Sequence, residues 1–420
     1  MSNRLPPSWR GARRILCVRL DSLGDVLMCT PAMRALRASI PGCYLTLLTS
    51  PSGAAAAPYI PELDAVIGYR APWMKHAQPA TPSALQDCAK RLTDGPAVPG
   101  AGRFDAAVIF TSYSQSPLPA ATLCHLAGIP LRLASCRENP YQLLTDWVPE
   151  REPERATRHE VQRQLDLVGH VGCTTADTAL SFAVPGAAAA CVKTMLEAAG
   201  IDPAAPYLVL HAGASAASRR YPIRHWQDLL GMLGARFGFP LILTGDQGER
   251  ESLRPLTETR TGPVHSLIGK LGLGELGALI RSSRLLITGN TGPAHIAAAV
   301  GTPLVDLYAP TNPQPPLARR APPAVPRRQL PQLPAQPLPA RTPRLSRSPG
   351  AKYGIGGGRR AAGKRPGTAG AHRGCGPGLR LTGSVLTLST CESAKDWAQT
   401  YNKNSSIPTS SDIISEFVGA

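Results

Sequence analysis

The chain has 420 residues and a formal net charge of +17, which is enough length for two domains that each have their own core. No apolar run approaches the roughly 18 residues that a membrane-spanning helix needs, and the basic N-terminus does not have the pattern of a secretory signal peptide. The ten cysteines include no C-x-x-C pair. We therefore expect a cytoplasmic protein with reduced thiols, and neither a disulfide framework nor a zinc site.

Most of the positive charge belongs to one segment. Residues 315–381 contain 14 Lys and Arg and no Asp or Glu, which leaves a net charge of +3 for the rest of the chain. The segment is rich in Pro, Gly and Ala without helical or strand periodicity, so it is predicted to be disordered. Three interpretations remain open: a basic arm for nucleic acid or a membrane surface, a plain disordered tail, and a frameshift product of GC-rich DNA, which is our preferred hypothesis. Residues 382–420 differ again in composition, and nothing beyond one short helix is predicted there.

The body of the chain, residues 14–314, alternates between apolar segments of strand length and segments with helical periodicity. Such alternation predicts an α/β protein with parallel sheets covered on both faces, in two Rossmann-like halves. A break at residues 181–190 separates the halves, and ligands of such sheets bind at the carboxyl ends of the strands. Helices are expected, for example, at 33–42, 225–238 and 273–283, and strands at 14–20, 44–50, 64–69, 104–110, 131–135, 207–213, 240–246, 264–269, 284–290 and 303–309.

The first motif is DSLGDVL, residues 21–27, directly after the first predicted strand. A dinucleotide site would have three glycines here, whereas this turn has Gly24 followed at once by Asp25. Gly24 allows a tight turn, and Asp25 is expected at or near the start of the next helix. A carboxylate at that place either stabilises the helix terminus by about 1 kcal/mol or takes part in chemistry. The residues alone leave both interpretations open.

The second motif is GNTGPAH, residues 289–295, which follows a predicted strand and opens a helix. Small residues such as Asn290, Thr291 and Gly292 leave backbone N–H groups accessible, and proline is well tolerated in a first helical turn. Such a helix N-terminus suits a phosphate group, and His295 lies within reach of the same anion. Taken alone, His295 is equally well explained as a surface or core histidine.

Two further motifs also follow predicted strands. Arg219 and Arg220 stand in a small-residue loop, where they either bind a phosphate or form a solvated pair. Glu249, in GDQGER, could accept hydrogen bonds from a ribose or could simply stabilise a helix N-terminus.

Together these segments resemble glycosyltransferase family 9, the ADP-heptose:lipopolysaccharide heptosyltransferases. The resemblance covers residues 14–314 and is carried by RLDSLGDVLMCTPAMRAL, RHEVQRQLDLVGHVG, RRYPIRHW, GDQGER and GNTGPAHIAAAVGTPLVDLYAPTNP, in the family's order. It implies the GT-B architecture, in which two Rossmann-like domains face each other across a cleft. The N-terminal domain, residues 1–180, would bind the acceptor, and residues 185–314 would bind the nucleotide sugar.

The resemblance also implies a mechanism and a set of site residues. Asp25 matches the family's proposed catalytic base for inverting transfer without a metal ion, and ADP-heptose would be the donor substrate, with no cofactor. The acceptor would be the lipopolysaccharide inner core, or another glycolipid, at the inner face of the membrane. Nucleic acid is not an expected partner, except through the basic tail. The residues implied for the nucleotide sugar are Arg219, Glu249, Asn290, Thr291, Gly292 and His295.

Three features depart from the family pattern. Arg219 stands where relatives often have Lys, and Asn290 stands where several have Asp. After Gln314 we find no continuation of the second domain, which is therefore expected to be incomplete. The alternative hypothesis is a catalytically disabled, transferase-like protein with a basic binding tail. A nicotinamide-dependent oxidoreductase is disfavoured, since the turn after the first predicted strand has the single glycine Gly24 and not the three glycines of a dinucleotide site.

Overall fold

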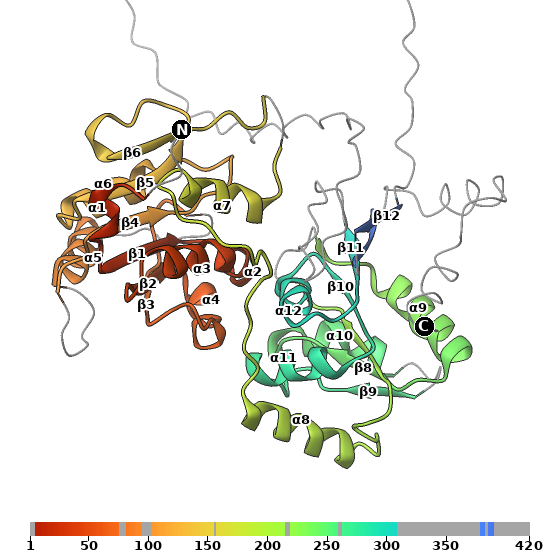
Figure 1. The fold of residues 1–420 in the computed structure, drawn as a ribbon. Coiled ribbons are helices and arrows are strands. Elements are labelled where there is room, and N and C mark those ends of the chain that lie inside the picture. The colour runs from red at the N-terminus through yellow and green to blue at the C-terminus, as the bar shows by residue number, and fades with distance from the viewer. Residues whose placement is uncertain are drawn as a thin grey trace, which may run out of the picture. The chain divides into compact units, whose positions relative to one another are not determined.

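A computed structural model gives the fold (Figure 1) and describes residues 5–74, 81–94, 102–154, 157–214, 219–258, 263–308, 379–382 and 385–389. The ten strands predicted between residues 14 and 309 are all present. They form two mainly parallel sheets, one in each half of the chain, which confirms the predicted α/β fold class.

The first sheet has the strand order β3-β2-β1-β4-β5-β6, and every neighbouring pair in it is parallel. This is the order of a doubly wound dinucleotide-type sheet, in which the chain reverses direction of growth between β1 and β4. Its strands are β1 (Arg14–Arg19), β2 (Tyr44–Thr49), β3 (Ala65–Gly68), β4 (Ala106–Ile109), β5 (Leu131–Cys136) and β6 (Asp146–Pro149).

Helices cover both faces of this sheet, because alternate residues of its apolar strands point to opposite sides. Ile15 and Cys17 of β1 pack into one cluster with α3 and α7, whereas Leu16 and Val18 pack into another with α5 and α6. The helices of this half are α1 (Pro7–Arg10), α2 (Leu23–Leu27), α3 (Thr30–Ser39), α4 (Pro51–Ala54), α5 (Pro82–Asp94), α6 (Leu118–Leu126) and α7 (Glu160–Gly169), with the 3-10 helices η1 (Ala57–Tyr59) and η2 (Tyr141–Leu143).

The second sheet has the order β12-β13-β11-β10-β7-β8-β9. Strands that follow β7 in the chain are added first on one side of it and then, from β10 on, on the other side, so the reversal point of this sheet lies between β7 and β10. Its strands are β7 (Leu208–His211), β8 (Leu241–Thr244), β9 (Val264–Ser266), β10 (Leu285–Gly289), β11 (Leu304–Tyr308), β12 (Leu379–Thr382) and β13 (Val385–Ser389). Its helices are α8 (Gly186–Ala198), α9 (Ile223–Phe237), α10 (Arg250–Thr257), α11 (Leu273–Ser282), α12 (Gly292–Val300) and the 3-10 helix η4 (Gln247–Glu249).

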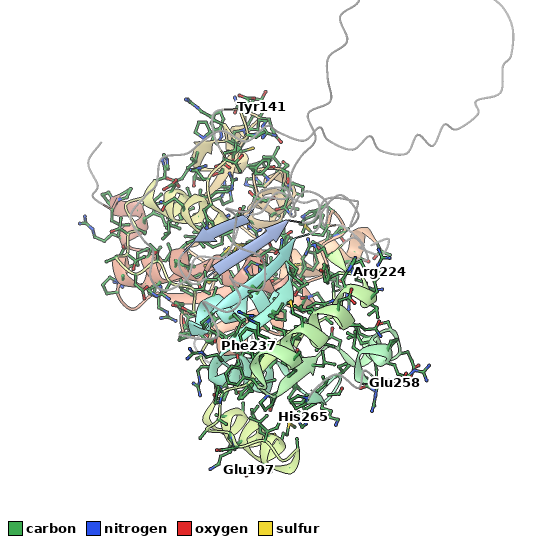
Figure 2. The ribbon with its side chains drawn as sticks, turned by 90° about the vertical axis from the view of Figure 1, so that its right-hand side faces the viewer. Tyr141, Glu197, Arg224, Phe237, Glu258 and His265 are labelled. Carbon is green, nitrogen blue, oxygen red and sulfur yellow. The ribbon has the colours of Figure 1, made fainter. Side chains whose placement is uncertain are left out.

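Two apolar clusters hold the second half together. One face of its sheet packs against α9 and α10, and the other packs against α8, α11 and α12. The latter face belongs to the same continuous cluster as α3 and α7 of the first half. Helix α9 ends at Phe237, labelled in Figure 2, because Gly238 adopts a left-handed conformation with φ of 66°.

The edge strand β6 was not predicted. It has four residues, ends in Pro149, and alternates between half-buried and exposed positions, so it lacks the apolar run that marks the inner strands. Tyr141, just before it in η2, has φ of 48° and is 83% exposed, and its side chain lies at the periphery of the ribbon in Figure 2.

The last two strands also differ from expectation. β13 pairs in parallel with β11, and β12 pairs antiparallel with β13, so this part of the chain extends the second sheet. The sequence analysis predicts disorder for residues 379–381 and no strand for 385–389, and both predictions are wrong. LRLT and VLTLS alternate with a period of two, as strands do, but they stand next to a segment rich in Pro, Gly and Arg that has no such period. Residues 315–378 lie outside the described residues.

Candidate active site

Both sheets bring their reversal points to one pocket. In a doubly wound sheet the crevice for ligands opens at the carboxyl ends of the two strands that flank the reversal. The pocket measures about 440 Å³, and its lining comes from the segments after β1 and β4, from the start of α7, and from the segments before α9 and after β10. The lining residues are Arg19, Ser22, Gly24, Asp25, Met28, Ser112, Tyr113, Ser114, Glu160, Arg219, Asn290, Thr291, Gly292 and His295.

Six of the seven residues singled out from the sequence line this pocket: Asp25, Arg219, Asn290, Thr291, Gly292 and His295. Glu249 does not. Its Oε2 atom accepts a hydrogen bond from the Asp246 N–H at 2.9 Å, so the carboxylate stabilises the first turn of η4. The same atom would be 1.9 Å from a Cβ at Gly213, so the carboxylate lies against the loop after β7.

Asp25 is the third residue of α2, a helix that begins after Ser22. Its Oδ2 atom accepts hydrogen bonds from Ser22 Oγ at 2.6 Å and from Ser22 N–H at 3.1 Å. This is a capping-box arrangement, so the helix-stabilising contact considered from the sequence is present. The carboxylate also lines the pocket with 30% of its side chain exposed, so capping does not remove it from solvent or from a ligand.

Arg19, at the end of β1, is the nearest cation to Asp25 and was not singled out from the sequence. Its side chain is 1% exposed, and its Nη2 atom lies 3.2 Å from Asp25 Oδ1. Burial alone would raise the pKa of Asp25, but the Arg19 guanidinium, the Ser22 hydroxyl and His295 outweigh it and hold the pKa below its usual value. Asp25 is therefore ionised at neutral pH.

Gly24 lies against the imidazole of His295. A Cβ at position 24 would be 2.3 Å from His295 Cδ2 and 2.7 Å from Nε2, so only glycine permits this approach of α2 to α12. His295 is 8% exposed, and its Nδ1 atom has no hydrogen-bond partner among the described residues. Burial lowers the pKa of His295 to about 4, only partly offset by Asp25. Near neutral pH, His295 is therefore a neutral side chain that adds no positive charge to the pocket.

This contact yields a first prediction. Gly24→Ala should cost about 1–3 kcal/mol of folding free energy, since the new methyl group overlaps a buried ring. The control is Gly186→Ala at the start of α8, where a Cβ meets nothing within 4 Å. Chemical denaturation of both variants is the measurement. Equal stabilities for the two variants would contradict the close approach.

The N-terminus of α12 lines the pocket next to α2, since a Cβ at Gly292 would be 3.2 Å from Leu23 Cδ2. Thr291 is the N-cap and Gly292 the first helical residue, and the first N–H groups of a helix have no partner within the helix. Arg219 lies beside them, because a Cβ at Gly289 would be 3.2 Å from the Arg219 carbonyl oxygen. Its exposed guanidinium is 3.5 Å from the Asn290 carbonyl oxygen. A helix N-terminus with an adjacent arginine is suited to a phosphate group.

The segment Ser112–Ser114, which follows β4, was missed by the sequence analysis. It brings three hydroxyl groups to the pocket, and the hydroxyls of Ser112 and Ser114 are 3.2 Å apart. The signal was available, since a polar run, TSYSQS, directly follows the apolar strand 104–110. The carboxyl end of a strand beside the reversal point is where such a run becomes part of a binding site.

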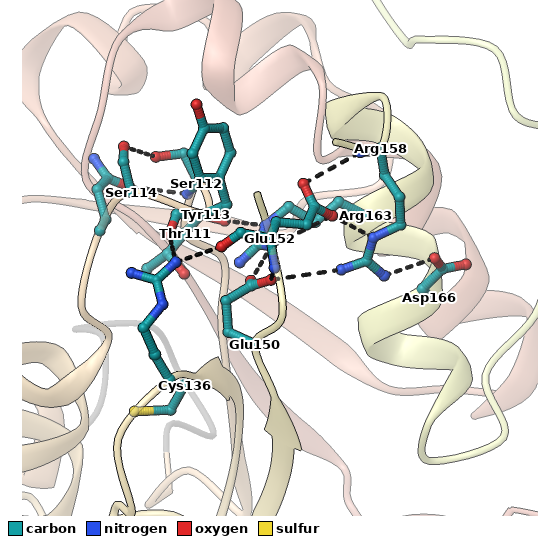
Figure 3. A network of polar contacts seen from close by, with 12 residues as sticks. Thr111, Ser112, Tyr113, Ser114, Cys136, Glu150, Glu152, Arg158, Arg163 and Asp166 are labelled. Atoms are coloured by element: carbon teal, nitrogen blue, oxygen red, sulfur yellow. Dashed lines mark hydrogen bonds and ion pairs between the residues drawn. The ribbon is translucent and has the colours of Figure 1, made fainter. Parts of the chain in front are cut away.

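A buried network behind this segment holds it in place (Figure 3). Arg163 of α7, 2% exposed, donates to the Thr111 carbonyl oxygen at 2.8 Å and pairs with Glu150. Glu152 pairs with Arg158, which also pairs with Asp166 at 2.8 Å. The network fixes the backbone immediately before Ser112, so α7 and the end of β6 determine where the hydroxyl groups lie.

The described residues were also compared with the requirements of a metal site, a disulfide and a membrane-spanning helix. Among the described residues, no group of three or more His, Cys, Asp or Glu is arranged to hold a metal ion. Seven of the eight cysteines described are buried as free thiols, and Cys191 is exposed. None of the helices described is both long and apolar enough to cross a membrane.

Known proteins resemble both the sequence and the fold. Lipopolysaccharide heptosyltransferase 1 of Pseudomonas aeruginosa is 24% identical over 306 residues, which cover 71% of this chain and 79% of that protein. The crystal structure of a glycosyl transferase family 9 protein from Veillonella parvula superposes with a TM-score of 0.60 at 21% identity, covering 75% of this chain and 84% of that one. The E. coli heptosyltransferase WaaC with ADP-2-deoxy-2-fluoro heptose superposes with a TM-score of 0.54 at 22% identity, covering 74% and 93%.

These likenesses confirm the GT-B fold that the resemblance implied. The family model for glycosyltransferase family 9 (heptosyltransferase) matches residues 102–329, which is more than half of the chain. That range contains the Ser112–Ser114 segment, α7 and the N-terminus of α12, and hence most of the pocket. The protein therefore belongs to glycosyltransferase family 9 and is a glycosyltransferase.

Proposed function

We propose that this protein transfers heptose from ADP-heptose to the lipopolysaccharide inner core, with inversion at the anomeric carbon. The observation that carries the proposal is the pocket that holds Asp25 together with Arg219 and the N-terminus of α12. Relatives named as lipopolysaccharide heptosyltransferases, and a structural neighbour named with an ADP-heptose analogue, support the choice of donor and acceptor.

The reaction uses two groups of pocket residues for different purposes. The ionised Asp25 accepts the proton of the acceptor hydroxyl while that oxygen attacks the anomeric carbon. The bond from the anomeric carbon to the diphosphate oxygen breaks, and ADP leaves. The hydroxyl groups of Ser112–Ser114, which line the same pocket as Asp25, orient the acceptor.

The negative charge that develops on the departing diphosphate needs stabilisation. The N–H groups of Thr291 and Gly292, with Arg219, supply positive potential in the pocket, and they support transfer without a metal ion. The neutral His295 adds a hydrogen bond. Glu249, next to the loop after β7, remains a candidate for binding the ribose of the donor.

We further propose that the enzyme works in the cytoplasm at the inner face of the membrane, where a lipid-linked acceptor is accessible.

Arg219 gives a second prediction. Arg219→Ala should weaken ADP binding by about 1.5–3 kcal/mol, the range for a lost hydrogen bond to a charged group. Isothermal titration calorimetry with ADP measures the change, and Arg224→Ala, an exposed arginine of α9 outside the pocket lining, is the control. Unchanged ADP affinity in Arg219→Ala would remove this residue from the donor site.

The proposed function itself is tested by turnover. Purified full-length protein is incubated with ADP-heptose and a heptose-free inner-core acceptor, and the acceptor is analysed by mass spectrometry. We expect addition of one heptosyl residue and release of ADP. Transfer from a different nucleotide sugar would correct the donor, and ADP binding without transfer from any nucleotide sugar would favour the disabled, transferase-like alternative.

A further inference from the structure

Three carboxylates share a single buried guanidinium beside the pocket. The Arg19 Nε atom lies 2.8 Å from Asp21 Oδ2, its Nη2 atom 3.2 Å from Asp25 Oδ1, and its Nη1 atom 2.7 Å from Glu160 Oε1. Each nitrogen therefore lies within ion-pair distance of a different carboxylate, and the contact with Asp25 is the longest of the three. The cluster has one cation and three anions, so it carries an excess of negative charge. Its central guanidinium is buried, since the Arg19 side chain is only 1% exposed.

The three carboxylates are not equivalent. Glu160 is fixed twice, by Arg19 and by Gln164 Nε2 at 2.8 Å. Asp21 accepts a further hydrogen bond from Gln115 Nε2 at 2.6 Å. Of the three side chains, Asp25 is the most exposed, at 30% against 17% for Asp21 and 9% for Glu160. The base is thus the carboxylate that the guanidinium holds most loosely and that a ligand reaches most easily.

We propose that Arg19 is the positioning residue of the catalytic base, and that Glu160 and Asp21 regulate its basicity by competing with Asp25 for the Arg19 guanidinium. This inference rests on the proposed function of Asp25. Arg19 keeps Asp25 ionised and directed into the pocket. Glu160 withdraws part of the cationic charge, so that Asp25 remains basic enough to accept a proton. A base paired with an undivided guanidinium would be a much weaker proton acceptor.

The remaining charged groups around Asp25 are consistent with this assignment. Burial raises the pKa of Asp21, whereas the pKa of Asp25 is lowered, with Arg19 as the strongest favourable influence. His295 is neutral near pH 7, so it does not replace Arg19 as the counter-ion. Among the described residues, the titratable groups that act on Asp25 are Arg19, Asp21, Cys29 and His295, and Glu160 shares the Arg19 guanidinium with it. His159 and Arg219 act in turn on His295.

The proposal predicts opposite changes for two variants. Removing the cation in Arg19→Gln leaves Asp25 beside two carboxylates, so its titration should move to higher pH, by about 1–3 pH units. Removing the competitor in Glu160→Gln should move the titration to lower pH. Arg19→Lys keeps the charge and should restore most of the wild-type behaviour. Activity falls as pH falls through the pKa of a base, so the acid limb of the pH–rate profile should move in the same directions.

The experiment is a pH titration of the Asp25 carboxyl carbon by NMR, in full-length protein labelled with ¹³C-aspartate. Asp25→Asn identifies the resonance by its disappearance, and the pH–rate profile of transfer is recorded on the same samples. The titration reads the charge of Asp25 even if no transfer occurs, so failure of the proposed function and failure of this inference are distinguishable. Because Glu160→Gln retains the buried cation, it provides an independent test should Arg19→Gln fail to fold.

The expected result is an Asp25 titration that moves up in Arg19→Gln, down in Glu160→Gln, and little in Arg19→Lys. The inference is overturned if Glu160→Gln leaves the Asp25 titration unchanged or moves it upward. It is also overturned if the Asp25 titration in folded Arg19→Gln matches that of the wild type, since Arg19 would then only support the fold.

Discussion

Asp25→Asn is expected to lower the rate of sugar transfer by a factor of about 10²–10⁴, which corresponds to about 3–5 kcal/mol of barrier. Asparagine has nearly the same size and can still accept the hydrogen bonds from Ser22, so the start of α2 is preserved. What is lost is the ability to take the proton of the acceptor hydroxyl. Steady-state rates with saturating donor and acceptor measure the effect.

The matched control for this variant is Asp228→Asn. It makes the same chemical change at a side chain of α9 that is 80% exposed and does not line the pocket. We expect its rate to stay within a few-fold of the wild type, and ADP affinity and melting temperature to change little in either variant. Near-normal turnover in Asp25→Asn would mean that Asp25 stabilises only the helix.

The second large effect is expected at Arg163. Arg163→Met leaves Glu150 buried without its main partner, and breaking a buried ion pair in this way costs about 3–5 kcal/mol of folding free energy. It also removes the donor to the Thr111 carbonyl oxygen, so the Ser112–Ser114 segment should lose its position. We therefore expect the KM for the acceptor to rise, with little change in ADP affinity.

The control for Arg163 is an ion pair on the surface. Lys193 and Glu197 of α8 are 3.9 Å apart and 66% and 53% exposed, and such pairs contribute about 0–1 kcal/mol. Lys193→Met should therefore leave urea denaturation nearly unchanged. If Arg163→Met unfolds at the same urea concentration as Lys193→Met, the buried ion pair of Arg163 in Figure 3 does not stabilise the folded protein.

Much of the fold could be predicted from the sequence, because parallel strands buried on both faces are apolar along their whole length. Segments such as ILCV and LILT have that property, and they correspond to β1 and β8. Edge strands have only one neighbour and one covered face, so β6 has no such run. The strand order could not be predicted, since long-range pairing leaves no periodic signal, yet it is this order that brings the two reversal points to the pocket.

The candidate site was predictable where local chemistry marks it. GNTGPAH signals a helix N-terminus for an anion by itself, and GD after a strand signals a carboxylate at a turn. Arg19 and Glu160 are ordinary charged residues in the sequence, and their pairing depends on a contact between positions 141 residues apart. A charged residue at the end of an apolar strand was nevertheless a usable signal, because a buried arginine needs carboxylate partners.

The anomeric configuration of the transferred heptose, determined by NMR of the product, shows whether Asp25 acts as the base in a single displacement. Direct attack by an acceptor hydroxyl that Asp25 deprotonates predicts a configuration opposite to that of the donor. A product with the donor's configuration would rule out this role, because it would require a mechanism other than a single displacement with Asp25 as the base.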